Sequence, residues 1–234
     1  MDKSKVIAGA LVAVGLLLLG ICIKGGIDNF ANKGRQVTVR GLSERTVDAN
    51  LVTWPIVTKE VGNNLPAIYN RIQSTNSRIV NFLESNGLSK TEFAVNAPQV
   101  EDRQAQGYNP REVTDRYLVT NVIVVSSEKV DLVRKLIEKV PELMQEGIAV
   151  VDGDYQYRTR YEFTGLNEIK PEMITEATQA ARQAAERFAA DSQSDIGKII
   201  TASQGQFSID DRDQYTPYVK TVRVVTYITY ELKN

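Results

Sequence analysis

The chain contains no histidine among its 234 residues, and this absence excludes a wide range of enzyme chemistry. Serine–histidine and cysteine–histidine catalytic pairs, histidine general bases and histidine-containing zinc sites all need an imidazole. The sequence also lacks the glycine-rich P-loop, the G-x-G-x-x-G turn and the G-x-S-x-G nucleophile elbow, which removes the usual nucleotide-binding and α/β-hydrolase motifs. We therefore expect a protein that is not an enzyme and that needs no cofactor.

Cysteine is nearly absent as well. Cys22 is the only one, so no intrachain disulfide can form and the apolar core alone must stabilise the fold. Ile21 stands where a lipoprotein signal would have a small residue, which favours a buried membrane thiol over a lipid-modified cysteine.

The sequence has no excess of charge of either sign. Its 28 lysine and arginine residues balance 29 aspartate and glutamate residues. Because nothing in this composition attracts a polyanion, we do not expect nucleic acid as a partner.

Only one long hydrophobic run is present. Residues 6–23 form 18 consecutive positions without a charge, which as a helix would be roughly 27 Å long, close to the hydrocarbon thickness of a bilayer. We expect a transmembrane anchor here, with residues 1–5 in the cytoplasm and residues 24–34 as a linker. A cleaved signal peptide has a shorter apolar region and a small-x-small site, and the residues after Ile23 lack that site. Whether the segment is ever cleaved stays open.

The lysines around this run set the expected orientation. Lys3 and Lys5 precede it with the free amine, and Lys24, Lys33 and Arg35 follow it, so the positive-inside rule favours a cytoplasmic N-terminus. The expected location is the inner (cytoplasmic) membrane, crossed once, with the C-terminal domain of residues 35–234 extracytoplasmic or periplasmic.

The first half of this domain, residues 35–127, shows the order strand, helix, strand, strand. The expected elements are strands at 36–40 and 49–61, a helix from Asn64 to Gly87, and strands at 92–100 and 117–125. We expect the first two strands to pair as a hairpin. The polar residues 101–114 are expected to form the tip between the last two strands.

A linking helix, residues 128–147, is predicted next, with Ser127 as its cap and Pro141 as a kink or restart. The second half, residues 148–234, repeats the order of elements: a strand at 148–163, a helix at 171–190, and strands at 199–209 and 219–232. The sequence thus predicts an α+β fold of two β-α-β-β units, with antiparallel sheet packed by helices and one N-terminal transmembrane helix in front.

Acidic side chains cluster where turns are predicted. Asp210, Asp211 and Asp213 are the best candidates for a cation site, while Asp152 and Asp154 lack the spaced ligands of an EF-hand loop. We expect solvated turns, with the Asp210–Asp213 loop as the one candidate for binding a metal ion.

An aromatic row marks the predicted strand at 148–163. Tyrosine, threonine and phenylalanine at the odd positions 155 to 163 alternate with glutamine, arginine and glutamate. Such a row could stack nucleic-acid bases, but the balanced charge favours an amphipathic strand that packs on a helix.

The two predicted hairpin tips are longer than sheet closure requires and combine tyrosine with arginine. Tyr108 and Arg111 lie in the first tip, and Arg212 and Tyr215 lie in the second. This composition is enriched at protein interfaces, so these four residues are candidates for contact with a second copy or with another envelope protein. Mobile, solvent-facing tips are the alternative.

Three segments resemble the SIMPL-domain family: Val39 to Glu44, then Ala49 to Val57 with its Trp54-Pro55 pair, and the alanine-rich helix from Glu176 to Ala189. The resemblance covers nearly all of residues 35–233. It implies an α+β protein of the bacterial periplasm or cell envelope without established catalysis. Some members of the family are linked to oxidative stress, and one envelope-antigen branch assembles into a channel-like ring. Family members secreted with a cleaved signal differ from this chain in their N-terminus.

The function that we expect from the sequence is therefore a structural or interaction role in the cell envelope, non-catalytic, membrane-anchored, homo-oligomeric and related to stress. The alternative is a periplasmic module that binds a small ligand or a cation. An enzyme that uses carboxylates alone is a third hypothesis.

Overall fold

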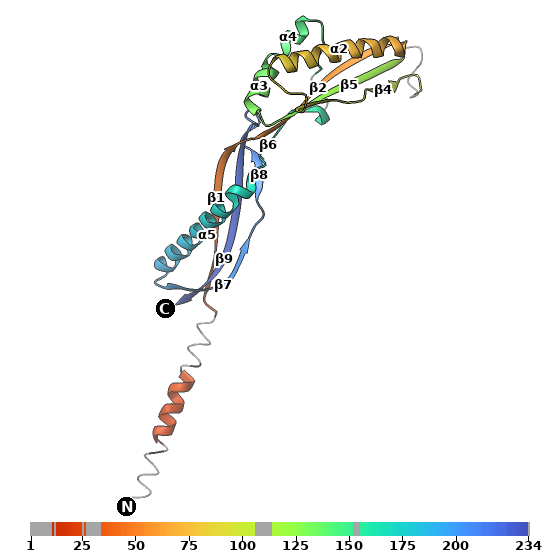
Figure 1. Ribbon diagram of the computed structural model, residues 1–234. Coiled ribbons are helices and arrows are strands. Elements are labelled where there is room, and N and C mark those ends of the chain that lie inside the picture. The colour runs from red at the N-terminus through yellow and green to blue at the C-terminus, as the bar shows by residue number, and fades with distance from the viewer. Residues whose placement is uncertain are drawn as a thin grey trace, which may run out of the picture. The chain divides into compact units, whose positions relative to one another are not determined.

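A computed structural model describes residues 11, 13–24, 26, 34–105, 114–151 and 155–233 (Figure 1). Its contacts divide the chain into two compact units. Unit 1 consists of Met1–Arg45, Asn167–Ser208 and Val222–Asn234, and unit 2 consists of Thr46–Leu166 and Ile209–Thr221. Each unit therefore combines segments that lie far apart in the sequence.

Unit 2 is built on a five-stranded antiparallel sheet in the order β3-β5-β2-β6, with β4 also paired to β5. Its strands are β2 (Leu51–Gly62), β3 (Phe93–Val95), β4 (Gln99–Asp102), β5 (Tyr117–Ser127) and β6 (Arg160–Glu162). The long pair β2 and β5 forms the centre, and Trp54 lies opposite Val125 in this ladder. The predicted strand at 92–100 is two strands, because Pro98 between them has no backbone N–H to donate.

Helices cover one face of this sheet. α2 (Leu65–Ser85) begins where predicted, because the Asn64 side chain accepts a hydrogen bond from the Ala67 amide at 3.1 Å, and Gly87 follows the helix with φ of 97°. α3 (Val130–Glu138) and α4 (Val140–Gln145) follow, with Pro141 at the start of α4 as expected. The core between these layers consists of large aliphatic residues packed around Trp54.

Unit 1 contains the second antiparallel sheet, in the order β1-β9-β7, and one long helix that lies along β1 and β9 (Figure 1). Its elements are β1 (Gln36–Asp48), α5 (Leu166–Asp191), β7 (Asp195–Gln204) and β9 (Val219–Lys233). The short β8 (Ser208–Asp211) also pairs with β9, and its residues from Ile209 onward belong to unit 2. α5 begins before Pro171 rather than at it, so a proline stands inside the helix. Mixed α+β architecture with two antiparallel sheets is confirmed.

The contact between α5 and β1 depends on small side chains. Ala177, Ala181 and Ala185 recur every fourth residue on one face of α5 and are fully buried, and Ala189 continues the row. Across from them lies Gly41 of β1. A Cβ atom placed on Gly41 would lie 1.8 Å from the carbonyl oxygen of Ala177, so only glycine permits this approach.

Polar bonds fix the end of the same contact. The Ser43 hydroxyl donates to the Glu176 carboxylate at 2.6 Å, and Arg45 donates to Glu172 at 2.9 Å and to Glu176. The hydrogen bonds from Arg45, and next from Ser43, lower the pKa of the Glu176 carboxyl below its ordinary value. These bonds join β1 to α5 across 127 to 133 residues of sequence.

The predicted hairpin between the first two strands is wrong. β1 pairs with β9 and β2 pairs with β5, so the two strands belong to different sheets. At the turn between them, the Ala49 amide donates to Tyr218 and the Asn50 amide donates to Glu162. The backbone groups that a hairpin would have paired locally therefore find partners far away in the sequence.

The predicted strand at 148–163 is also wrong over most of its length. Val150 forms an isolated bridge to Thr58, a 3₁₀ helix η1 (Tyr155–Tyr157) follows, and among the described residues of this segment only Arg160–Glu162 form a strand. Thr58 and Thr53, the β2 partners of Val150 and Arg160, are five residues apart, whereas Val150 and Arg160 are ten residues apart. The residues in excess cannot all pair with β2, so side-chain alternation alone does not make a strand here.

Residues 13–24 are helical, and within the described parts of the chain no helix has both the length and the apolar character needed to cross a membrane. The predicted span at 6–23 lies partly outside the described residues.

Gly41→Ala should destabilise unit 1 strongly, because the new methyl group would overlap the α5 backbone. We expect a loss of about 3 kcal/mol or more, which would lower the midpoint of thermal unfolding by roughly 6–12 °C. Thermal unfolding followed by circular dichroism measures this shift. Gly34→Ala is the matched control, since a Cβ atom there meets nothing within 4 Å, and an equal shift in the two variants would contradict the close approach.

Candidate functional site

The acidic loop between β8 and β9 is held together by its own side chains. Asp213 accepts hydrogen bonds from the amides of Tyr215 and Thr216 at 2.8 Å each, and from the Thr216 hydroxyl and Arg212. The Thr216 hydroxyl is the main cause that lowers the pKa of Asp213 to about 2. Asp211 forms an ion pair with Lys220. These bonds use the carboxylate oxygens that a cation would need.

No group of three or more acidic or cysteine side chains within the described residues could hold a metal ion. Asp210, Asp211 and Asp213 follow one another along the loop, but the structure does not bring their carboxylates together around one point.

Two of the four interaction candidates are described. Tyr215 is 82% exposed at the tip of the β8–β9 loop. Arg212 is tied to Asp213 at 3.2 Å and to Thr216 at 3.0 Å. Tyr108 and Arg111 lie outside the described residues. The second tip is thus a structured loop that presents a tyrosine side chain to solvent.

This acidic loop and the aromatic segment, which the sequence presents as separate candidates, meet in unit 2. They line one pocket of about 350 Å³, to which Asp211, Pro217 and Lys220 contribute from one side and residues Tyr155 and 158–162 from the other. Lys220 is only 7% exposed. The aromatic row does not form a stacking platform, because η1 breaks its alternation.

An aromatic column stands next to this region. Arg134 of α3 lies over the Tyr218 ring at 3.5 Å, and Tyr161 of β6 meets Tyr218 edge to face, with ring centroids 6.1 Å apart. Burial raises the pKa of the Tyr161 hydroxyl above its ordinary value. The column fixes the place of β6 against α3 and the start of β9.

A second pocket, of about 290 Å³, lies on the sheet face that α2 does not cover. Pro55 and Val124 are directly opposite in the β2–β5 ladder, and so are Val57 and Val122, which places all four side chains on one face. Val57 is 1% exposed, whereas Pro55, Val122 and Val124 line the pocket. Part of this second apolar layer remains open as the floor of the pocket.

Two arginines stand at the rim of this second pocket. Arg160 pairs directly with Thr53 of β2, so its side chain lies on the same sheet face as the pocket floor. Arg158 lies 4.8 Å from the centre of the Tyr155 ring. Within the described part of the chain, neither guanidinium forms an ion pair with a carboxylate.

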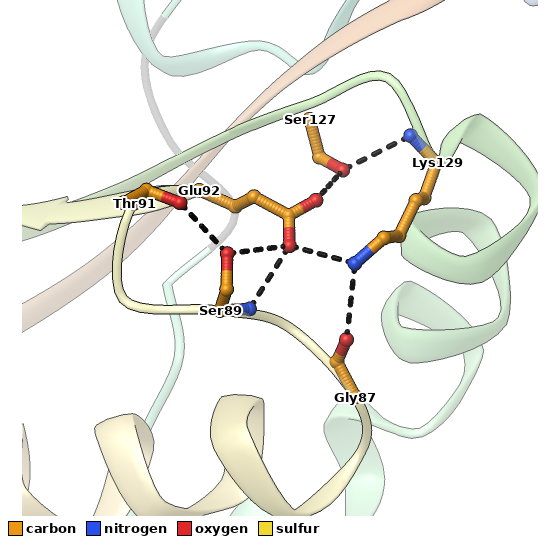
Figure 2. A network of polar contacts seen from close by, with 6 residues as sticks. All are labelled: Gly87, Ser89, Thr91, Glu92, Ser127 and Lys129. Carbon is orange, nitrogen blue, oxygen red and sulfur yellow. Dashed lines mark hydrogen bonds and ion pairs between the residues drawn. The ribbon is translucent and has the colours of Figure 1, made fainter.

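The densest polar network surrounds Glu92, between α2 and α3 (Figure 2). Its carboxylate accepts from the Ser127 hydroxyl at 2.5 Å, from Lys129 Nζ at 2.8 Å, and from the Ser89 amide and hydroxyl at 2.9 Å each. The Glu92 side chain is 16% exposed. Lys129, and next Ser127, are the main causes that lower the pKa of Glu92 from 4.5 to about 2.

This network is an anchor rather than a reactive centre. The Ser127 hydroxyl accepts a hydrogen bond from the Lys129 amide at 3.0 Å, just before α3 begins at Val130. Lys129 Nζ also donates to the Gly87 carbonyl at 3.3 Å. Ser127 therefore precedes α3 but is not its N-cap, which is Lys129. The hydrogen bonds from Ser127 and Lys129 to Glu92 and Gly87 join the turn after α2 to the start of α3.

Comparison with known proteins gives one family. A family model named SIMPL and described as a protein of unknown function (DUF541) matches residues 37–226. The chain belongs to the SIMPL family. The resemblance drawn from the sequence is thereby confirmed, and no curated protein matches the chain.

Sequence reasoning missed the two most developed clusters of this SIMPL chain. Glu92 stands at the start of a predicted strand, and although Ser89 is close in sequence, the partners Ser127 and Lys129 follow 35 and 37 residues later, so no local signal marks them. Arg158 and Arg160 are visible as the polar side of an alternating segment. Their place over an apolar pocket depends on the pairing of β6 with β2, which the alternation does not indicate.

The Glu92 network predicts an acid-sensitive contribution to the stability of unit 2. Because the pKa of Glu92 is lowered in the folded state, its contribution is complete above pH 4.5 and is lost as the pH falls towards about 2. Glu92→Gln should reduce the free energy of unfolding by about 2 kcal/mol at pH 7, and the difference from the parent should shrink at low pH. Urea unfolding at several pH values measures this difference.

Glu128→Gln is the matched control, since it removes an exposed carboxylate close to the same helix start. We expect only a small change in the free energy of unfolding at pH 7, because this side chain is exposed. A difference between Glu92→Gln and the parent that stays constant from neutral to acid pH would show that the charge of Glu92 does not act through this network.

Proposed function

We propose that this SIMPL protein is a non-enzymatic interaction protein of the cell envelope. Residues 6–23 anchor it in the inner membrane, and residues 35–234 lie on the extracytoplasmic side. The observation that carries the interaction role is the exposed side of unit 1: α5 covers one face of the sheet, β7 presents apolar side chains to solvent, and the other face presents polar and aromatic side chains.

β7 is the clearest docking element in unit 1. Along its ten residues almost every side chain is exposed, and Ile199 and Ile200 are 53% and 50% exposed. The register of β7 against β9 shifts on both sides of Ile199, which marks a bulge at this apolar pair. An exposed apolar pair on an edge strand is a typical site for contact with another chain.

The face of this sheet that α5 does not cover carries mainly polar side chains. Thr38 of β1 and Thr229 of β9 are hydrogen-bonded across the strands at 3.0 Å, and Thr201 of β7 lies opposite Thr229. Arg40 lies 5.2 Å from the centre of the Tyr227 ring. Surfaces that combine tyrosine and arginine with short polar side chains are favoured in protein interfaces.

The anchor is supported by its exposed apolar side chains. Eight large hydrophobic residues of the helical segment are between 53% and 68% exposed: Leu11, Val14, Leu16, Leu17, Leu18, Leu19, Ile21 and Ile23. Protein contacts do not cover these described side chains, and so much apolar surface is stable only against another apolar phase.

The anchor predicts that the full chain stays with membranes during alkaline carbonate washing. Val14→Lys with Leu17→Lys should release it, since each central lysine costs about 3 kcal/mol of insertion free energy. Fractionation of expressing cells, followed by immunoblotting, measures the distribution. Leu42→Lys with Val100→Lys places the same charges on exposed apolar positions of the two sheets and should leave the chain in the membrane fraction. Release of the parent chain by carbonate would refute the anchor.

Self-association is the simplest form of the interaction role. Ile199→Ser with Ile200→Ser should lower the mass of the detergent-solubilised full chain, measured by light scattering, without changing its thermal transition, because both side chains are already exposed. Tyr215→Ser in the same measurement shows whether the β8–β9 tip, rather than β7, mediates the self-association. Val100→Ser, at another exposed apolar position, is the control. A parent chain that is monomeric at high concentration would leave only a partner of another kind.

A further inference from the structure

The pocket beneath Arg158 and Arg160 has the composition of a small-ligand site, and what it would bind does not depend on the interaction role proposed above. Its floor is apolar, made by Pro55, Val122 and Val124 of the central strands, and its volume is about 290 Å³. Binding sites for small molecules are mostly apolar, with a few fixed polar groups that orient the ligand. Here those groups are two guanidinium ions at one side of the floor.

The surrounding structure brings both arginine side chains to this pocket. The ladder contact between Arg160 and Thr53 places one of them on the pocket face. The Tyr155 ring supports the other, 4.8 Å from the Arg158 carbon to the ring centre. An arginine that is already held in place loses less side-chain entropy when it binds an anion, which increases affinity.

We propose that this pocket binds a small organic carboxylate, with the carboxylate between Arg158 and Arg160 and an apolar body on Pro55, Val122 and Val124. The planar fork of a guanidinium matches a carboxylate with two parallel hydrogen bonds. The apolar floor then discriminates against anions that carry no hydrocarbon. Gln156 and Asn96, which also line the pocket, provide amide donors at its rim.

Isothermal titration calorimetry of the full chain in nanodiscs, with empty nanodiscs as reference, tests this site. Benzoate is the probe, because it combines a carboxylate with a flat apolar body. Benzamide has the same shape without the charge, acetate has the charge without the body, and inorganic phosphate is an anion without hydrocarbon. We expect benzoate to bind with a dissociation constant below about 10 mM and the other three to bind about tenfold or more weakly.

Arg158→Gln and Arg160→Gln should each weaken benzoate binding, and the double variant should weaken it by about tenfold or more. Both side chains are exposed, so we expect the thermal transition to be unchanged in these variants. Arg182→Gln removes an exposed arginine that pairs with Glu186 on α5, and it should leave binding unchanged.

Three results would overturn the proposal. Equal binding of phosphate or acetate would reduce the site to a basic patch without an apolar component. Equal binding of benzamide, or unchanged benzoate binding in the double arginine variant, would show an apolar groove without recognition of the carboxylate. No binding of benzoate at concentrations on the order of 10 mM would remove the site.

Discussion

The close contact between α5 and β1 is the constraint on which unit 1 depends. Gly41 has no side chain, and the α5 residues that face β1 are alanines at every fourth position, so the backbones of helix and strand can approach closely. Such small side chains bury little apolar area each, so the contact gains less from the hydrophobic effect than a layer of leucine would. The hydrogen bonds from Ser43 and Arg45 to Glu176 fix the register of helix and strand where packing alone specifies it weakly.

Unit 2 is stabilised differently. Its core is a layer of large aliphatic residues around Trp54, and a buried polar group lies within it: the Asn121 amide donates to Asn76 at 2.7 Å and to Thr58 at 3.2 Å. Buried amides that satisfy one another select one arrangement of the helix on the sheet, since any shift would leave a polar group without a partner. The Glu92 network has the same effect at the start of α3.

These two ways of packing leave different surfaces for function. In unit 1, the single helix covers one face of the sheet and leaves the other face and β7 exposed. In unit 2, both faces of the central strands carry apolar side chains. On the second face, residues of η1 and β6 border the pocket under Arg158 and Arg160.

The sequence by itself determined what depends on neighbours along the chain and on residue types. The start of α2 at Asn64, its end before Gly87, and the restart at Pro141 follow from local backbone chemistry, and the missing histidine excludes imidazole chemistry whatever the fold. The α+β class and the family followed from the same patterns. Only the tertiary structure decided that β1 pairs with β9, that Tyr155–Tyr157 form a 3₁₀ helix instead of a strand, and that Glu92 and Arg160 find their partners. The physical reason is that strand pairing joins residues far apart in sequence, and the alternation of side chains does not specify which edge a strand will meet.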